Sequence, residues 1–508
     1  MPLSHRDAMV MHNPIGCGGK RFLTPLLMAC LVAVAANADE PNANPNPKRE
    51  RESSTAASPR RPNVLFLLTD DQRPDTIAAL GNPAIRTPNL DALVRSGTTF
   101  TRAICANPIC TPSRAEILSG CTGFTNGVLD FGKRIDPGLK LWPQAMREAG
   151  YHTWYVGKWH NDGRPHLRGY EETLGLFAGG GSKWWKDQVD HHGRPVTGYR
   201  GWVFQSSDGK EKHPERGVGL TADISAKFAD AAVELIRRKS EKPFFLHVNF
   251  TAPHDPLLMP PGYDAKYPPS KMALPKSFRG EHPFDHGNFR GRDEVLLPFP
   301  RTAADVKADL AVYYSVISHL DEQIGRVLKA LKDTGQAENT LVIFASDHGL
   351  AMGSHGLRGK QNMYEHTIGV PLIVGGPGIP AGEKRDAQVY LRDLYPTVCD
   401  LAGIEIPRTV EGRSLRPVLA GEAKEVYPAV FGYFRGYQRM IRTKRWKLVH
   451  YPEVKRWQLF DLDADPDELH NLADDPRHAE VRLRLVGDLR RLQASVRDPA
   501  YNPTKNGE

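Results

Sequence analysis

The sequence lacks a dense set of cysteines and, after its first forty residues, any long apolar run. Six cysteines in 508 residues are too few to build a disulfide scaffold, and two of them, Cys17 and Cys30, lie in the N-terminal leader. Cys105 and Cys121 could pair, but the sequence does not decide whether they do. No stretch after the leader is apolar enough to cross a bilayer, so we expect no integral membrane span.

The chain also lacks the patterns of two common ligand classes. No long basic stripe with interleaved aromatic residues supports nucleic-acid binding, although the net charge is +8. No His-x-x-x-His or Cys-x-x-Cys spacing supports a zinc site, and the pair His191-His192 lies in a polar, glycine-flanked stretch typical of a loop. A mildly basic protein favours anionic ligands in general, and composition alone indicates no function.

The first forty residues are typical of an export signal. Two basic residues precede an apolar run, and Ala36-Asn37-Ala38 offers a cleavage site. We therefore expect a signal peptide at 1–38 and a secreted or periplasmic protein. A lipoprotein signal ending at Cys30 is the alternative, which we do not favour because this cysteine lies inside the apolar run. Residues 39–61 are rich in Pro, Asn, Ser and Arg and are typical of a disordered linker.

Short apolar runs alternate with helical patterns over the next 340 residues or so. The runs are Val64–Leu68, Thr153–Val156, Phe244–Phe250, Leu341–Ala345 and Pro371–Val374. Apolar residues at steps of three and four predict helices over Thr221–Arg238 and Thr302–Thr334. Strands that alternate with helices predict an α/β catalytic domain over 62–404, with a large, mainly parallel sheet flanked by helices.

The pattern changes after about residue 405. Met440–Val449 and Gln458–Leu462 have the composition of short strands, and a terminal helix is expected near Ala479–Ser495. We therefore expect a smaller α+β domain over 405–508.

Polar residues follow four of the apolar runs, at the position where open α/β sheets place their ligands. They are Asp70-Asp71, Gly157-Lys158-Trp159-His160, Pro253-His254-Asp255 and Asp347-His348-Gly349. Paired aspartates are hard oxygen ligands suited to Ca²⁺ or Mg²⁺. Each of these residues, taken singly, is more often a turn residue, a helix cap or a satisfied core residue. Their joint placement at one edge of the sheet is what indicates an active site.

The most specific pattern is Cys110-Thr111-Pro112-Ser113-Arg114, followed by an apolar position and Gly120. It resembles the hallmark C-x-P-S-R of the formylglycine-dependent (type I) sulfatase family. Segments that begin at Thr87 and Leu459 are also similar to that family, and the resemblance covers roughly residues 61–475. Without the family, the motif would be an ordinary buried cysteine before a helix, with Pro112 near its first turn.

The resemblance implies an alkaline phosphatase-like fold and two sets of site residues. The implied metal ligands are Asp70, Asp71, the modified Cys110, Asp347 and His348. The implied sulfate-handling residues are Arg114, Lys158, His160, His254 and Lys360. Many sulfatases have Asn in place of His348, and the Asp-His-Gly form is closer to the iduronate-2-sulfatase-like branch. Because Ca²⁺ prefers oxygen, His348 is the least secure of these ligands.

The resemblance also implies a mechanism. A formylglycine-generating enzyme would oxidise Cys110 to formylglycine, whose hydrate carries two hydroxyls on one carbon. One hydroxyl, with one Ca²⁺ per chain and activated by Asp347, would attack sulfur, and His254 with Lys360 would protonate the leaving alcohol. His160 would then deprotonate the second hydroxyl, which expels sulfate and restores the aldehyde.

We therefore expect a sulfuric ester hydrolase that acts on a sulfated carbohydrate rather than on a simple aryl ester. Aromatic and basic residues mixed over 179–216 and 256–300 suit the rim of a sugar pocket, and they equally suit a loop anchored by buried tryptophans. One alternative is a phosphonate or phosphate ester hydrolase of the same superfamily. Another is an inactive protein that binds sulfated glycans, which the presence of the nucleophile and of every charged ligand disfavours.

Overall fold

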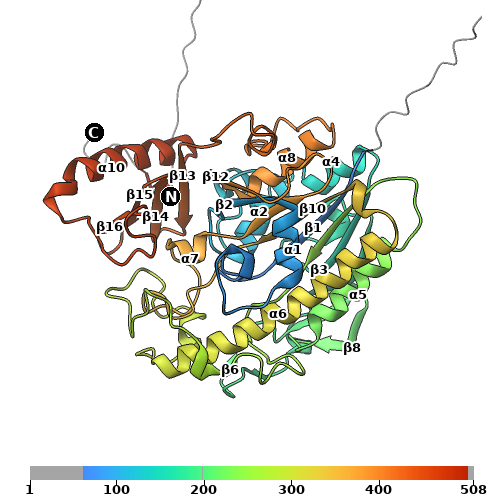
Figure 1. The fold of residues 1–508 in the computed structure, drawn as a ribbon, viewed down its shortest axis with the longest axis horizontal. Helices are drawn as coiled ribbons and strands as arrows, with labels where there is room; N and C mark the ends of the chain where they lie inside the picture. Colours follow the sequence, from blue (N-terminus) through green and yellow to red (C-terminus); the bar gives the residue numbers. More distant parts are fainter. Residues whose placement is uncertain (1–60, 197, 502–508) are drawn as a thin grey trace, which may run out of the picture. The chain divides into compact units, whose positions relative to one another are not determined.

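A ten-stranded mixed sheet carries the fold in a computed structural model that describes residues 61–196 and 198–501 (Figure 1). Its strand order is β12-β2-β11-β10-β1-β9-β3-β4-β7-β8. In chain order the strands are β1 Asn63–Thr69, β2 Gly97–Ile104, β3 His152–Lys158, β4 Glu172–Gly179, β7 Trp202–Gln205, β8 Lys212–Val218, β9 Phe244–Asn249, β10 Thr340–Ser346, β11 Leu372–Gly375 and β12 Glu383–Tyr390. Only β11 and β7 run antiparallel to both of their neighbours in this sheet, which confirms the prediction of a mainly parallel sheet.

Strand β1 shows how helices cover both faces of the sheet. Val64, Phe66 and Leu68 pack with α2, α4 and α8, whereas Leu65 and Leu67 pack with α1, α5 and α6. This alternation follows from the two-residue period of a strand, and burial on both faces explains the continuous apolar run. The helices are α1 Pro88–Ser96, α2 Cys110–Ser119, α3 Gly123–Asn126, α4 Trp142–Glu148, α5 Ile224–Ile236, α6 Ala303–Asp333, α7 Glu365–Ile368, α8 Leu394–Leu401, α9 Arg416–Leu419 and α10 Ala479–Ser495.

The predicted elements of the large sheet are present, but several strands were not predicted. The five apolar runs form β1, β3, β9, β10 and β11, and the two helical patterns form α5 and α6. The strands β2, β4, β7, β8 and β12 escaped prediction. Strand β8 is mostly half-exposed or exposed, and β12 begins with exposed charged residues, so neither has a continuous apolar run.

A second sheet of four antiparallel strands follows, and α10 packs against it. Its strands are β13 Ala429–Phe434, β14 Gln438–Thr443, β15 Trp446–Tyr451 and β16 Arg456–Asp461. The predicted terminal helix and the strand near Gln458–Leu462 are confirmed. The single strand predicted over Met440–Val449 is instead parts of two strands, β14 and β15, and β13 was not predicted. The domain boundary between residues 404 and 405 stays a prediction.

The expected signal peptide at 1–38 and all but the last residue of the expected linker lie outside the described residues. Among the helices that the structure describes, none combines the length and the apolar character that a bilayer crossing requires. Cys105, Cys110, Cys121 and Cys399 are buried and free, so the pairing of Cys105 with Cys121 that the sequence left open is not formed.

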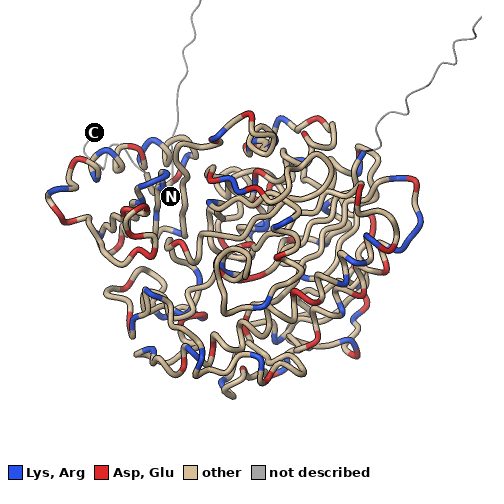
Figure 2. Tube along the Cα trace, viewed as in Figure 1, with Lys and Arg blue, Asp and Glu red and all other residues tan. Residues whose placement is uncertain are grey.

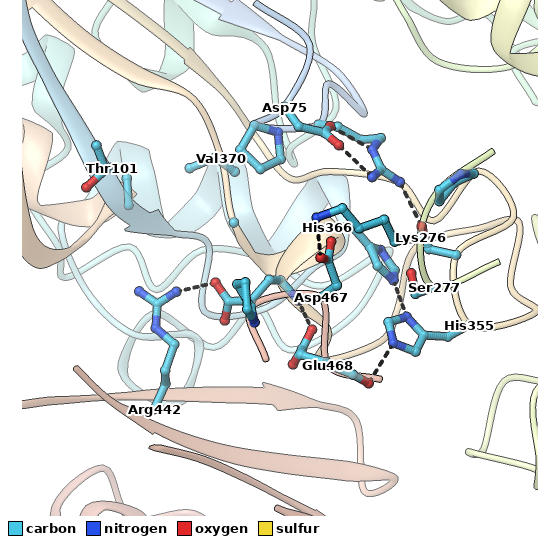
Figure 3. A pocket seen from close by; sticks show the side chains of 18 residues that line it. Asp75, Thr101, Lys276, Ser277, His355, His366, Val370, Arg442, Asp467 and Glu468 are labelled. Carbon is cyan, nitrogen blue, oxygen red and sulfur yellow. Dashed lines mark hydrogen bonds and ion pairs between the residues drawn. The ribbon is translucent and has the colours of Figure 1, made fainter. Parts of the chain in front are cut away.

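A cavity of about 360 Å³ lies where the small sheet approaches loops of the large sheet (Figure 3). Its charged side chains are paired, six of them with one another and Glu468 with the buried Lys447. Arg73 lies 2.8 Å from a carboxylate oxygen of Asp75, and Arg442 lies 2.6 Å from one of Glu365. Lys276 similarly meets Asp467 at 3.0 Å. Because these charges are compensated internally, we do not assign this cavity a ligand. The predicted catalytic residues surround a different cavity.

Candidate active site

The structure brings all ten predicted site residues together. Strands β1, β3 and β10 run in the same direction, and their ends deliver Asp70-Asp71, Lys158 and Asp347-His348. Cys110 is the first residue of α2, and Arg114 lies one turn further along the same helix. His160, His254 and Lys360 come from the loops that follow β3, β9 and β10. All of these residues are buried except His160, which is half-buried.

Each of the three buried carboxylates has a basic partner. The ammonium of Lys158 donates to Asp70 Oδ2. Lys360 Nζ donates to both oxygens of Asp71, at 2.7 and 3.0 Å. The third carboxylate, that of Asp347, accepts a 2.9 Å hydrogen bond from Arg114 Nε. A buried carboxylate without such partners would carry a large desolvation cost, and these pairs offset part of it.

Cys110 lies among these charges. Its Sγ is 3.4 Å from Asp70 Oδ1, 3.4 Å from His348 Nε2 and 3.5 Å from Lys360 Nζ. Burial opposes the thiolate, but Lys158, Lys360 and His348 outweigh it, and the pKa of the Cys110 thiol falls well below its usual range. The sulfur is therefore held as a reactive group and not as an inert core residue.

The donors around Cys110 fit a divalent cation. One ligand atom each from Asp70, Asp71, Cys110 and His348 lie within 4.8 Å of one another. Asp347 is next to them, with its Oδ1 3.6 Å from His348 Nε2. Burial and the charge of Asp70 raise the pKa of Asp347 to about 7, so a further positive charge would stabilise its carboxylate. Carboxylate oxygens suit Ca²⁺ or Mg²⁺.

Arg114 offers a binding group for an anion. Its NH1 donates to Asn249 Oδ1 at 2.6 Å, while NH2 lies 3.6 Å from Asp70 Oδ1 and makes no hydrogen bond to a described residue. Buried polar groups in native proteins are normally satisfied, so this guanidinium edge suits a bound anion or water. Ser113, from the same motif, donates to the backbone carbonyl of Asp347 at 2.7 Å, which ties α2 to the end of β10.

Two histidines can move protons in this site. His254 Nδ1 faces Asp255, 2.7 Å from its carbonyl oxygen, and Nε2 lies 3.8 Å from Asp71 Oδ2. The ring of His160 stands edge-on to Trp202, with centroids 4.9 Å apart, and its Nδ1 has no partner among the described residues. Burial lowers the pKa of His160 to about 4, so at neutral pH the ring is uncharged and can accept a proton.

Several supporting residues were not predicted. Tyr199 donates a 2.5 Å hydrogen bond to Asp70 Oδ2, and Asn249 ends β9 beside Arg114. Glu294 accepts hydrogen bonds from the backbone nitrogens of Arg358 and Gly359, at 2.8 and 2.9 Å, just before Lys360. The end of a predicted strand could have pointed to Asn249. Tyr199 lies in a loop and Glu294 begins a single 3-10 turn, Glu294–Leu296, and neither segment has a periodicity that would mark it in the sequence.

Cys110, His160, His254 and Lys360 line a cavity of about 380 Å³, whereas Arg114 and Lys158 lie behind its lining. It is lined by Cys110, Phe131, His160, Gly198, Tyr199, Trp202, His254, Asn288, Gly291, Arg292, Asp293, Lys360, Gln361 and Arg435. Both stretches expected at the rim contribute, the first through Trp202 and its neighbours and the second through residues 288–293. Trp184, Trp185, His191 and His192 also lie in the first stretch, but they do not line this cavity.

The histidine pair disfavoured as a zinc site lies beside a carboxylate. Nε2 of His191 and Nε2 of His192 are 3.4 and 3.6 Å from Asp309 Oδ1. Arg194 donates to the same oxygen at 2.9 Å and already neutralises this carboxylate. A cation would compete with the guanidinium, so we do not assign a metal to this group.

Comparison with known proteins gives two family matches. A model described as "Sulfatase" matches residues 62–404, and one described as "N-sulphoglucosamine sulphohydrolase, C-terminal" matches residues 353–495. An arylsulfatase of Clostridium perfringens is 30% identical over 465 residues, covering 84% of this chain and 94% of that protein. An N-acetylglucosamine-6-O-sulfatase of Bacteroides thetaiotaomicron is 27% identical over 515 residues, covering 86% of this chain and 87% of that protein.

Two solved structures have similar folds. One is an enzyme in complex with its substrate D-glucosamine-2-N,6-O-disulfate, with a TM-score of 0.72 and 25% identity, covering 87% of this chain and all of that chain. The other is the phosphonate monoester hydrolase of Agrobacterium radiobacter, with a TM-score of 0.70 and 25% identity, covering 86% of this chain and 96% of that chain.

Proposed function

The chain belongs to the sulfatase family, and we propose that it hydrolyses a sulfate ester of a saccharide with an aldehyde derived from Cys110 and one bound Ca²⁺. The observation that carries this proposal is the position of Cys110. It lies at the bottom of a cavity, next to the carboxylates of Asp70 and Asp71 and the ammonium of Lys360. The placement near the iduronate-2-sulfatase-like branch stays a prediction.

Two groups supply chemistry that the unmodified residues lack. The cation, held by Asp70, Asp71, Asp347 and His348 beside the modified Cys110, supplies positive charge against the sulfate ester. The aldehyde formed from Cys110 supplies, as its hydrate, a nucleophilic hydroxyl and a second hydroxyl on the same carbon.

The chain's own bases would bind the sulfate group. Lys158 and Lys360 lie on two sides of the carboxylate cluster, and Arg114 NH2 lies 3.6 Å from Asp70 Oδ1 without a hydrogen bond to any described residue. Preorganised positive groups in a buried site stabilise the charge that develops in the transition state more strongly than solvent does. These three bases therefore orient the ester and lower the barrier.

Proton transfer is assigned to the two histidines. Burial disfavours the charged form of His254, but Asp71 outweighs it and raises the pKa of the ring, so His254 can donate a proton to the leaving alcohol. His160 lines the same cavity as Cys110 and is uncharged at neutral pH, so it can take the proton of the second hydroxyl.

A phosphonate or phosphate ester hydrolase is the second candidate function, because the phosphonate monoester hydrolase of similar fold covers most of this chain. The same charged groups would serve phosphoryl transfer. Rates on 4-nitrophenyl sulfate, 4-nitrophenyl phosphate and a matched phosphonate monoester separate the two functions, and we expect the sulfate to be preferred.

The test of the aldehyde is a mass spectrum of the tryptic peptide 103–114, from protein exported by its native host. We expect a mass about 18 Da below that of the unmodified peptide. Cys105 lies in the same peptide and serves as the internal control, since iodoacetamide would label it but not the aldehyde. An unmodified Cys110 in active protein would refute the mechanism. Conversion to the aldehyde also requires a formylglycine-generating enzyme as maturation partner.

Export is part of the same proposal. The supporting observation is the apolar run after Lys20-Arg21 that ends at Ala36-Asn37-Ala38. We expect the N-terminal sequence of the protein recovered outside the cytoplasm to begin at Asp39. Intact leader on the active protein would contradict this.

A further inference from the structure

The cavity has an outer half that the proposed chemistry does not use. We define this outer half as Phe131, Trp202, Asn288, Gln361 and Arg435, which line the cavity together with the catalytic residues. They come from the start of β7, from separate loops of the large-sheet part and from the hairpin between β13 and β14. The substrate group attached to the sulfate must therefore contact them.

Two of these side chains form an aromatic wall. Phe131 is 43% exposed, and its ring centroid lies 5.5 Å from that of His160, which in turn is 4.9 Å from Trp202. A large apolar ring exposed at the mouth of a charged cavity suits the C–H face of a sugar. Asn288 and Gln361 add amide groups, joined by a 2.5 Å hydrogen bond, that can bind hydroxyls.

The charge of Arg292 is already compensated. This residue donates to both oxygens of Asp255, at 2.7 and 2.9 Å, and also pairs with Asp293. Both carboxylates are buried. Arg292 therefore holds Asp255 in place beside His254 and is not available to a ligand.

Arg435 differs from Arg292 in its partner. Its only carboxylate partner among the described residues is Asp130, which Nε meets at 2.8 Å and NH2 at 3.1 Å. The side chains of Arg435 and Asp130 are 36% and 32% exposed, so solvent weakens this pair. The NH1 nitrogen of Arg435 has no hydrogen-bond partner in the part of the chain that the structure describes. Asp130 thus orients the guanidinium and leaves one edge for a ligand.

The turn between β13 and β14 sets the backbone conformation of Arg435. Its φ is 44°, in the left-handed region that hairpin turns use, and the next residue is Gly436. The turn places this long charged side chain at the edge of the cavity. Basic and acidic residues are otherwise interspersed along the described chain (Figure 2), so the attraction of this cavity for anions is local.

Building on the proposed function, we propose that the outer half binds one sugar ring and that Arg435 binds a second acidic group, a sulfate or a carboxylate, on that sugar. Of the three Lys and Arg residues that line the cavity, Arg292 and Lys360 are paired with buried carboxylates, whereas the carboxylate partner of Arg435 is 32% exposed. The volume of about 380 Å³ lies near the lower end of the range of ligand pockets, roughly 300–1,000 Å³. It therefore suits a terminal sugar rather than the interior of a polymer.

The test compares Arg435→Gln with a matched control, Arg445→Gln. Arg445 lies between β14 and β15 of the same sheet, is 56% exposed, pairs with Asp461 and does not line the cavity. Four sulfate esters are used: 4-nitrophenyl sulfate, N-acetylglucosamine 6-sulfate, glucosamine 2-N,6-O-disulfate and a 2-sulfated uronic acid. Each sugar is measured both as a substrate and as a competitive inhibitor of the aryl ester.

We expect the wild type to bind the sugars with two acidic groups more tightly than the sugar with one. Arg435→Gln should weaken binding of the doubly acidic sugars by about 10- to 100-fold, mainly in KM or Ki, and change the aryl ester by less than about threefold. Comparing the effect of Arg435→Gln on the disulfate and on the 2-sulfated uronic acid shows whether the second acidic group is a sulfate or a carboxylate. Arg445→Gln should leave every value unchanged.

An equal loss on all four esters, or wild-type preference for the singly acidic sugar, would overturn the proposal. Failure of the proposed function gives a different result, because the wild type with a confirmed aldehyde would then hydrolyse no sulfate ester, the aryl ester included. Hydrolysis of the aryl ester without a selective effect of Arg435→Gln refutes only the second acidic group.

Discussion

Glu294 is expected to position Lys360 through the backbone, and Glu294→Gln tests this. Glu294 is fully buried, accepts from the nitrogens of Arg358 and Gly359, and pairs with Arg301 NH2 at 2.8 Å. A glutamine side chain has one acceptor oxygen in place of two and no charge. The variant therefore loses at least one backbone hydrogen bond and leaves Arg301 without its carboxylate.

The expected cost follows from these contacts. Breaking a buried ion pair by removing one partner costs about 3–5 kcal/mol, and part of this cost is the unpaired backbone nitrogen. The unfolding entropy is about 2 cal/mol/K per residue over the roughly 440 described residues, and dividing the lost free energy by this entropy gives a thermal midpoint that is roughly 3–5 °C lower. A displacement of about 1 Å in a catalytic group can lower the rate about 100-fold, so kcat should fall as well.

Calorimetry and kcat on 4-nitrophenyl sulfate measure the two effects of Glu294→Gln. The control is Glu338→Gln, an exposed glutamate in a short turn before β10, which should change neither quantity. Removing Arg301 as well, in the double variant with Arg301→Met, should restore part of the stability because no unpaired charge remains. An unchanged midpoint would refute the ion-pair reasoning, and a lower midpoint with unchanged kcat would show that Glu294 does not position Lys360.

Three further predictions concern protons and the cation. Because burial lowers the pKa of His160 to about 4, the acid limb of the kcat profile should lie near pH 4, and a limb near 6.5 would contradict the base role. Removal of the cation by a chelator should lower the unfolding midpoint and abolish turnover, because a cation at about 100 times its Kd adds about 2.7 kcal/mol to the free energy of unfolding. In a calcium titration, the Asp347→Asn variant should require more Ca²⁺ than the wild type to reach the same midpoint. Burial lowers the pKa of His286 to about 3, below its unfolded value, so its contribution to stability is present above pH 6.5 and is lost as pH falls. His286→Gln should therefore reduce the slope of unfolding free energy against pH by about 1.4 kcal/mol per unit between pH 6 and 4, measured by denaturation at fixed temperature.

The inner part of the site could be predicted because the fold places it at strand ends. Apolar runs marked the strands β1, β3, β9 and β10. Asp70 and Asp347 come directly after β1 and β10, and Lys158 is the last residue of β3. The direction of parallel strands then requires these residues to meet at one edge. The motif at Cys110 added the helix that faces them, and the observed contacts join all of these groups.

The remaining parts lacked a periodic signal. Half-exposed edge strands such as β8 carry polar residues that hide the two-residue alternation, so their pairing is decided by the neighbouring strand. Tyr199, Glu294 and Arg435 reach the site from loops and a hairpin whose paths depend on tertiary packing. Their roles follow from distances between side chains in the folded protein, and these distances cannot be derived from the spacing of residues along the chain.

The difference between the two halves of the cavity has a consequence for specificity. The residues around Cys110 lie on strand ends, on α2 and in the loops that follow β3, β9 and β10, and those with a charge are 7% exposed or less and have buried partners. In the outer half, Phe131 and Arg435 are 43% and 36% exposed and are held by loops. A substitution in the outer half therefore changes contacts with the sugar without moving the groups that surround sulfur. Choice of substrate and rate of sulfur–oxygen cleavage should vary independently, with outer-half variants acting on KM for sugars and inner-half variants acting on kcat for every ester.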